Sequence, residues 1–215
     1  MCCPLICIHR FIFMYIYSSL SLTLVGMCDT SVNYVVAALL ILASAQLDVL
    51  SRRLRALGGR RGAHDDVVDC VKHHQHIIEF VKELSSIFRL PIFFQIVISS
   101  IVLCMAVYKI SVTNEPVELI TMIFYLICVL LELMMYCYPG DLLMNKSLAV
   151  SEAAYSGDWV NCDLRTRKML LLMIMRSQRP MVINAGGVYK LCLPTAATVV
   201  QTSYSYYAML KQTAN

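Results

Sequence analysis

The stretch "LITMIFYLICVLLELMMYCY", residues 119–138, determines which class of fold this chain can adopt. A helix that crosses the hydrocarbon core of a bilayer needs about 20 mainly apolar residues, and this stretch has that length and composition. It therefore predicts a membrane-spanning helix. The tripeptide "PGD" follows at 139–141, and a proline–glycine pair predicts that the helix ends there.

Similar apolar runs recur along the chain and are typical of a multi-spanning membrane protein. Of the 215 residues, 59% are hydrophobic and 15% are charged, whereas soluble domains are usually about 45–50% apolar and about 25% charged. The apolar residues lie in long runs separated by short charged stretches. We therefore predict an all-α fold, a polytopic membrane helical bundle made of one domain, 1–215, with spans at about 11–50, 91–110, 119–138 and 181–213.

Several of the predicted helices extend beyond the bilayer. The first apolar run continues to Gly58 and Gly59, which is too long for one crossing at about 1.5 Å per residue, so its second half should project from the membrane. In residues 60–90, apolar positions recur at helical spacing between charges and predict an amphipathic helix that leads into the second span. Asp29 lies inside the first apolar run. Because a carboxylate at membrane depth is costly, we expect it to face the bundle or a wet cavity.

The basic residues predict how the spans are oriented. Eight lysines and arginines lie between the first two spans and six between the last two, whereas the turn between spans two and three has only Lys109 nearby. Basic loops stay on the cytoplasmic side, so the C-terminus is predicted to be extracellular. The first helix then starts outside, which suggests that preceding spans are missing from this chain. The net charge of +4 is modest and does not indicate a nucleic-acid partner.

The polar motifs do not indicate enzyme chemistry. The sequence has no G-x-S-x-G, H-E-x-x-H, phosphate-loop or dinucleotide-binding pattern, so neither an enzyme nor a cofactor is predicted. In "CVKHHQH", 70–76, Cys70 with His73 or His74 has the spacing to share a helical face and hold a metal. A polar helix face is the favoured interpretation, because no second ligand pair exists elsewhere. The glycine pair in "NAGGVYK", 184–190, is interpreted as a flexible or closely packed point in a helix.

Five stretches of the chain carry a family resemblance. "YCYPGDLL" at 136–143 precedes the stretch from "AAYSGDW" to "RSQRP" at 153–180 and the stretch from "INAGGVYK" to "YSYYAML" at 183–210. Upstream, the segments 29–58 and 73–104 come in the matching order. Together they resemble helices four to seven, the C-terminal half, of the insect odorant receptors, a seven-helix olfactory family unrelated to G-protein-coupled receptors. The resemblance covers nearly the whole chain from about residue 10.

The resemblance implies a course for the chain and a function. Helices four to six would occupy 11–57, 71–110 and 115–138, and the seventh would form two parts, at about 163–179 and 182–213. Receptors of this family form ligand-gated, non-selective cation channels in the plasma membrane of olfactory neurons. The seventh helices line the pore, and cytoplasmic extensions of helices four to seven form an anchor between subunits. The implied partners are an odorant co-receptor subunit in a heterotetramer, small volatile ligands and the lipid bilayer.

The resemblance also implies site residues. Pore-lining candidates lie in the last turns of the final span: Met209, Gln212 and Thr213. Ligand-binding candidates are aromatic residues of the first and third spans: Phe13, Tyr17, Phe124 and Tyr125. Aromatic walls with a few hydroxyls suit small volatile ligands; the alternative is that these aromatics pack in the bundle or lie at the membrane interface. Lys211 would repel cations and is expected to point away from the pore axis.

The sequence leaves two alternatives to this function. The first is a gustatory receptor, although that branch usually ends in T-Y, five apolar residues and Q, whereas this chain has "SYSYYAMLKQ" at 203–212. The second is a truncated, non-signalling receptor fragment that assembles through the anchor region without binding odorant.

Overall fold

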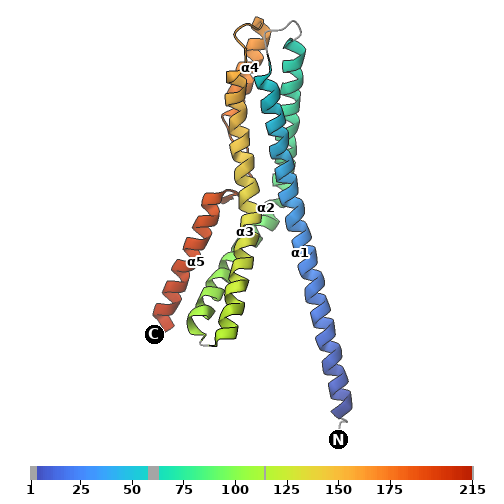
Figure 1. Cartoon of the computed structure of the whole chain (residues 1–215), viewed down its shortest axis with the longest axis vertical. Helices are drawn as coiled ribbons and strands as arrows, with labels where there is room; N and C mark the ends of the chain where they lie inside the picture. The colour runs from blue at the N-terminus through green and yellow to red at the C-terminus, as the bar shows by residue number, and fades with distance from the viewer. Residues whose placement is uncertain (1–3, 58–62, 114, 215) are drawn as a thin grey trace.

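Long helices make up most of the structure. The computed structural model describes residues 4–57, 63–113 and 115–214 (Figure 1). The elements in chain order are α1 (Pro4–Arg55), α2 (Ala63–Val112), α3 (Pro116–Ser156), α4 (Leu164–Ser177), β1 (Asn184–Ala185), β2 (Tyr189–Lys190) and α5 (Leu193–Ala214). Among the described helices, α1, α2 and α3 are long and apolar enough to cross a membrane. The predicted all-α membrane bundle is confirmed, whereas the predicted helix end at Gly58 and Gly59 lies outside the described residues.

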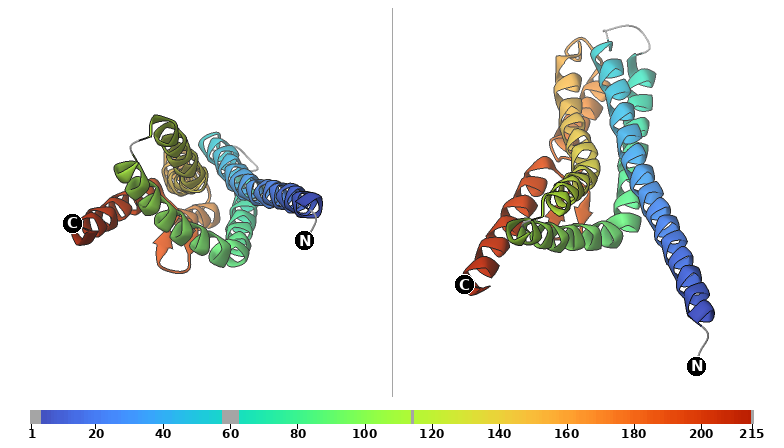
Figure 2. Two further views of the ribbon diagram at one scale, coloured as in Figure 1. Left: turned by 90° about the horizontal axis from the view of Figure 1, so that it is seen from below. Right: turned by 60° about the horizontal axis from the view of Figure 1, so that its bottom comes forward.

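The helices are bundled at one end of the molecule and diverge at the other. Figure 1 shows α4 beside α1, α2 and α3 at one end, the α4 end, and both chain termini at the opposite end, the termini end. α1 packs most extensively on α3, while α5 packs on α2 and α3. Figure 2 shows α1 and α5 leaving the bundle on opposite sides as they approach the termini.

The core follows one stripe along the second half of α1. Leu40, Leu47, Leu50 and Leu54 are fully buried, and their spacing of seven, three and four residues places them on one helical face. From residue 8 up to Asn33, every residue of α1 is exposed. The half of α1 that was predicted to project from the bilayer therefore carries most of its packing.

α3 continues through Pro139 and Gly140, so the predicted end of the third helix at 139–141 is wrong. Both residues are buried. A Cβ atom on Gly140 would lie 2.5 Å from the carbonyl oxygen of Leu191 and 2.9 Å from its Cβ, so the two backbones are in close contact. A proline removes one hydrogen bond from a helix, and here the tight packing of both residues holds the helix together across that defect.

The last helix begins at Leu193, so the predicted helical start near 181 is also wrong. The preceding residues form a β-hairpin in which β1 pairs antiparallel with β2. The turn between them contains Gly186 and Gly187, with φ of 62° and 82°. Positive φ at both central residues suits a tight hairpin turn and favours glycine. The glycine pair is thus a turn and not a point within a helix.

The hairpin docks on α2, beside which it lies in Figure 2. The amide of Gly186 donates to the carbonyl oxygen of Arg89 at 3.1 Å. A Cβ atom on Gly186 would lie 2.5 Å from the ring of Phe93, so only a glycine fits there without displacing that ring. Phe93 also stacks on Tyr189, with ring centroids 6.5 Å apart. These contacts fix the point at which α5 starts.

Candidate functional site

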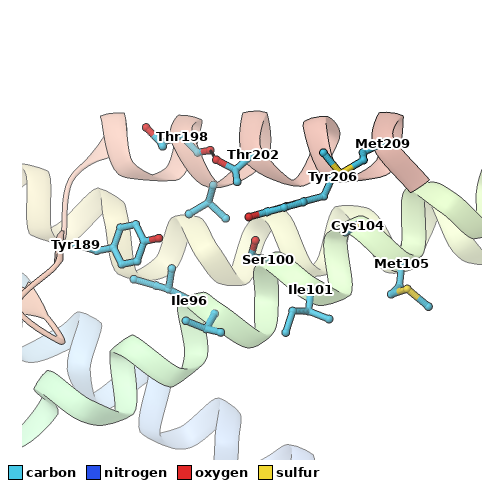
Figure 3. Close-up of a pocket in the computed structure, with 12 residues that line it drawn as sticks. Ile96, Ser100, Ile101, Cys104, Met105, Tyr189, Thr198, Thr202, Tyr206 and Met209 are labelled. Atoms are coloured by element: carbon cyan, nitrogen blue, oxygen red, sulfur yellow. Dashed lines mark hydrogen bonds between the residues drawn. The ribbon is translucent and has the colours of Figure 1, made fainter. Parts of the chain in front are cut away.

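The last third of α2 has an apolar pocket on each side, one facing α5 and one facing α3. The pocket facing α5, the α2–α5 groove, has a volume of about 560 Å³. Its walls are contributed by α2, β2 and α5, with principal residues Ile96, Ser100, Cys104, Met105, Tyr189, Thr202, Tyr206 and Met209 (Figure 3). Such a volume lies within the range of small-molecule sites.

The serine and threonine hydroxyls of α5 that lie near α2 are satisfied within the protein, which explains how so polar a helix packs against α2. Ser203 is buried, and its hydroxyl lies 3.3 Å from the hydroxyl of Ser100 and 2.8 Å from the carbonyl oxygen of Val199. Thr198 and Thr202 donate to carbonyl oxygens one turn earlier, at 2.9 and 2.7 Å. Hydroxyls that bond back to their own helix in this way are tolerated in apolar surroundings.

The pocket facing α3, the α2–α3 pocket, has a volume of about 570 Å³. Tyr125 lines it, together with Met122 of α3 and with Tyr108 and Val112 near the end of α2. Tyr125, which is 47% exposed, is the predicted ligand residue that the structure places along an open, mainly apolar pocket between two helices.

The other predicted ligand residues do not join Tyr125. Phe124 is 69% exposed and is not part of the α2–α3 pocket. Phe13 and Tyr17 are 69% and 64% exposed on the unpacked half of α1. Phe13 borders only a shallow depression formed by its neighbours between His9 and Ile16. Within the described residues, these three aromatics therefore have no common cavity.

The predicted pore residues lie at the end of α5. Met209 borders the α2–α5 groove and is 64% exposed. Gln212 and Lys211 are exposed, and the side chain of Thr213 lies outside the described part of the chain. Helical spacing places Gln212 opposite the buried Ser203, on the face of α5 turned away from α2.

A polar cluster inside the bundle went unpredicted. One carboxylate oxygen of Glu132 accepts from the side-chain amides of Asn33 at 2.9 Å and of Gln95 at 2.6 Å. The Tyr136 hydroxyl donates to the amide oxygen of Asn33. These four residues, the polar node, join α1, α2 and α3. The signal that could have revealed it is Glu132, an acid inside an apolar stretch long enough to span a membrane.

Asp29 lies beside the polar node and not within it. Its residue is exposed in the described chain, and its carboxylate lies 3.5 Å from the amide nitrogen of Asn33. Asn33, one turn later, is the residue that enters the bundle, with 5% exposure. Asp29 was expected to face the bundle, but it lies only at the edge of the bundle.

Among the described residues, the histidines proposed as a metal site form no group of three metal-ligating side chains. His74 is 3% exposed, and burial lowers its pKa to about 4, with the Arg176 guanidinium acting in the same direction. The His73 ring nitrogen lies 3.1 Å from the side-chain oxygen of Gln46 on α1. Cys70 is buried. His74 is thus a neutral core residue near the α4 end, and neither the metal reading nor the solvated polar face describes it.

Relatives of known type match most of this chain. Odorant receptor Or2 of Anopheles gambiae is 28% identical over 186 residues, which cover 81% of this chain and 49% of that protein. Odorant receptor 46a, isoform A, of Drosophila melanogaster is 28% identical over 208 residues, which cover 93% of this chain and 54% of that protein. The chain spans about half the length of the curated relatives it matches.

Solved structures match the fold. The olfactory receptor OR5 from Machilis hrabei superposes with a TM-score of 0.77 at 18% identity, over 85% of this chain and 48% of that one. The same receptor in complex with eugenol superposes with a TM-score of 0.75 at 19% identity, over 82% of this chain and 46% of that one. The model of the 7tm Odorant receptor family matches residues 6–204. The chain therefore belongs to the 7tm Odorant receptor family.

Proposed function

We propose that this chain acts as an odorant receptor subunit that binds volatile odorants and, with the odorant co-receptor, forms a ligand-gated, non-selective cation channel. Family membership and three membrane-capable helices support the proposal. The subunit lies in the plasma membrane as a multi-pass protein in a heterotetramer. Its C-terminus is extracellular, an orientation supported by the basic residues that cluster at 52–89 and at 146–179, on one side of the predicted spans.

The α2–α3 pocket is the observation that carries the ligand-binding part of the proposal. It combines a mainly apolar wall with the polar side chains of Tyr108, Lys109, Thr113 and Tyr125 in a volume of about 570 Å³. An apolar pocket with few polar groups suits a small volatile molecule, which binds mainly by burying apolar surface. The related Machilis receptor has been solved with eugenol, which supports a small ligand here. Phe13, Tyr17 and Phe124 stay as weaker candidates, because they lie outside this pocket.

The end of α5 carries the channel part of the proposal. Met209 supplies an apolar side chain and Gln212 a polar one within a single turn. Hydrophobic constrictions gate ion flow by losing their water. Met209, Gln212 and Thr213 would form this subunit's share of the gate.

Current recording from cells that co-express the receptor and the co-receptor tests the proposal. We expect odorant-evoked cation currents from a panel of volatiles, and Tyr125→Ala should change the ranking of the ligands. Phe124→Ala is the matched control, because Phe124 is the adjacent aromatic on the same helix but lies outside the pocket. An unchanged ranking in Tyr125→Ala would remove the α2–α3 pocket from the proposal.

Two further outcomes of the recordings bear on the gate residues and on the receptor-fragment alternative. Unchanged permeability and basal current in both Met209→Ala and Gln212→Ala would argue against the gate residues. Surface assembly with the co-receptor but no response to any volatile would support a non-signalling receptor fragment.

A further inference from the structure

The α2–α5 groove is a cavity that the proposed odorant pocket does not use. The two cavities lie on different sides of α2 and share only Ile101 and Met105 at their borders. Tyr125 lines the α2–α3 pocket and not the groove. A molecule in the groove would therefore contact a separate set of side chains, among them Met209 of α5.

The chemistry of the groove selects a neutral, mostly apolar molecule. None of the residues that line it carries a charge, and its walls include Ile96, Ile101, Met105 and Val199. Burying a charged group against such walls would be costly, whereas apolar contact is favourable. The groove is thus suited to a hydrocarbon-rich ligand.

Hydroxyl groups gather in the middle of the groove. Figure 3 shows the phenols of Tyr189 and Tyr206 directed toward each other from opposite ends, with Ser100 between them. Within the described chain, neither phenol hydroxyl forms a hydrogen bond. A hydroxyl in apolar surroundings gains from a partner, so these groups favour a ligand that carries one hydroxyl or carbonyl oxygen. The tail of a phospholipid has no such group to offer.

We propose that the α2–α5 groove is a second binding site, for a small neutral alcohol or phenol whose oxygen meets Tyr189, Ser100 and Tyr206. Its occupancy also changes gating, and this second part rests on the proposed channel function. Ser203 holds α5 against Ser100 at 3.3 Å on one side of the groove. A ligand that fills the space between α2 and α5 acts as a strut from that contact to Met209, and so shifts the end of α5.

Photolabelling tests the binding site without any need for current. The probe is 3-azioctanol, an alkanol that forms a covalent adduct on illumination, applied to the chain in cell membranes, with the labelled residues mapped by mass spectrometry. We expect adducts on groove residues, above all Tyr206, and loss of these adducts in the presence of excess 1-octanol. Groove adducts that excess 1-octanol does not displace would mean that the probe partitions there without a saturable site, and absence of groove adducts would mean that lipid or protein fills the groove; either result would overturn the proposal.

Substitutions sharpen the labelling test. Thr202→Trp fills the groove and should abolish its adducts, whereas Ser205→Trp should keep them. Ser205 is the matched control, because its hydroxyl also bonds back to its own helix, at 3.0 Å from the carbonyl of Gln201, but it lies outside the groove. Should Thr202→Trp fail to reach the membrane, Tyr206→Phe removes one hydroxyl at nearly constant shape. Loss of one hydrogen bond should weaken competition by 1-octanol about fivefold, and equal competition in wild type and Tyr206→Phe would refute the role of the hydroxyls.

Current recording tests the coupling to the gate. In the receptor with its co-receptor, Thr202→Trp should alter the effect of 1-octanol on the odorant-evoked current while the ranking of odorants is kept. Tyr125→Ala should alter the ranking and keep the effect of 1-octanol. Groove adducts without any channel current would refute the proposed channel function but not the site, whereas currents insensitive to Thr202→Trp would refute the coupling.

Discussion

Glu132 of α3 hydrogen-bonds to residues of α1 and α2, so it has a structural role in joining these three helices. It is the shared acceptor for the amides of Asn33 and Gln95. Side chains that hydrogen-bond across helices inside a membrane protein hold those helices in register, and leaving their donors unpaired is costly.

Replacing Glu132 should therefore destabilise the bundle. We expect Glu132→Leu to lower the free energy of unfolding by about 1–3 kcal/mol, because the buried amide of Asn33 and the half-buried amide of Gln95 lose their acceptor. Glu132→Gln keeps an acceptor oxygen and should cost less. The measurement is the thermal unfolding midpoint of the chain in detergent. The control is Glu118→Leu, the same change at an exposed position of α3; equal midpoints in the two leucine variants would contradict the prediction.

His74 should make stability depend on pH. Its pKa is about 4 in the folded chain, against about 6.5 when unfolded. Between pH 6.5 and pH 4 the histidine is therefore protonated in the unfolded state but neutral in the folded state. As the pH falls through this range, protonation stabilises the unfolded state, so the free energy of unfolding decreases.

The measurement is the unfolding midpoint of the chain between pH 7.5 and pH 5. His74→Leu should flatten this profile. His76→Leu is the matched control, because His76 is a neighbouring histidine with a 79% exposed side chain, and it should leave the profile as it is. A profile that is equally steep in His74→Leu would rule out this histidine as the cause.

At the scale of the elements, the contact between α3 and the chain after the hairpin decides where α5 starts. Gly140 brings the α3 backbone against Leu191, and the amide of Leu191 donates to the carbonyl oxygen of Ile183 at 2.9 Å. The hairpin is held on its other side by Arg89 and Phe93 of α2. α5 is thus placed by two long helices through a short two-stranded element.

A methyl group at Gly140 should disturb this arrangement. The new Cβ would lie 2.5 Å from a backbone oxygen, which cannot turn aside as a flexible side chain can. We expect Gly140→Ala to destabilise the chain by about 1–3 kcal/mol, the usual cost of overpacking. Gly26→Ala is the control, because Gly26 lies in a helix and a Cβ there meets open space; alanine is also the better helix former. Surface delivery and the unfolding midpoint should fall in Gly140→Ala alone.

At the scale of the whole molecule, packing and membrane exposure are divided between the two ends. At the α4 end, α3 packs on both α1 and α4, with buried apolar residues from all three helices, and Lys146 of α3 pairs with Asp48 of α1 at 2.8 Å. At the termini end, α1 and α5 diverge and the apolar pockets open. Helix packing is therefore concentrated at the α4 end, and the apolar pockets lie toward the termini end.

The proposed topology predicts opposite accessibility for the two ends. A glycosylation sequon appended after the C-terminus should be modified in cells, whereas one inserted in the loop between α3 and α4, at 157–160, should not. The reason is that basic loops are retained in the cytoplasm. The gel shift on enzymatic deglycosylation is the measurement, and the reverse pattern would invert the proposed orientation.

The class of fold, the long helices and the family were all readable from the residues alone. Apolar run length and helical periodicity are local properties, and they suffice to predict helices that cross a membrane. The seventh helix was even predicted in two parts, and α4 (Leu164–Ser177) lies within the first of them.

Packing between segments that are far apart in the chain decided the features of the fold and the site that the sequence did not predict. Pro139 and Gly140 have the sequence of a helix end, yet the close contact with Leu191 keeps α3 continuous. Gly186 and Gly187 form a turn because Arg89 and Phe93 hold the hairpin against α2. Tyr125 reaches a pocket while its neighbour Phe124 does not, because adjacent residues of a helix point in different directions and α2 packs on only one face of α3. Contacts of this kind join residues far apart in the chain, so no local pattern records them.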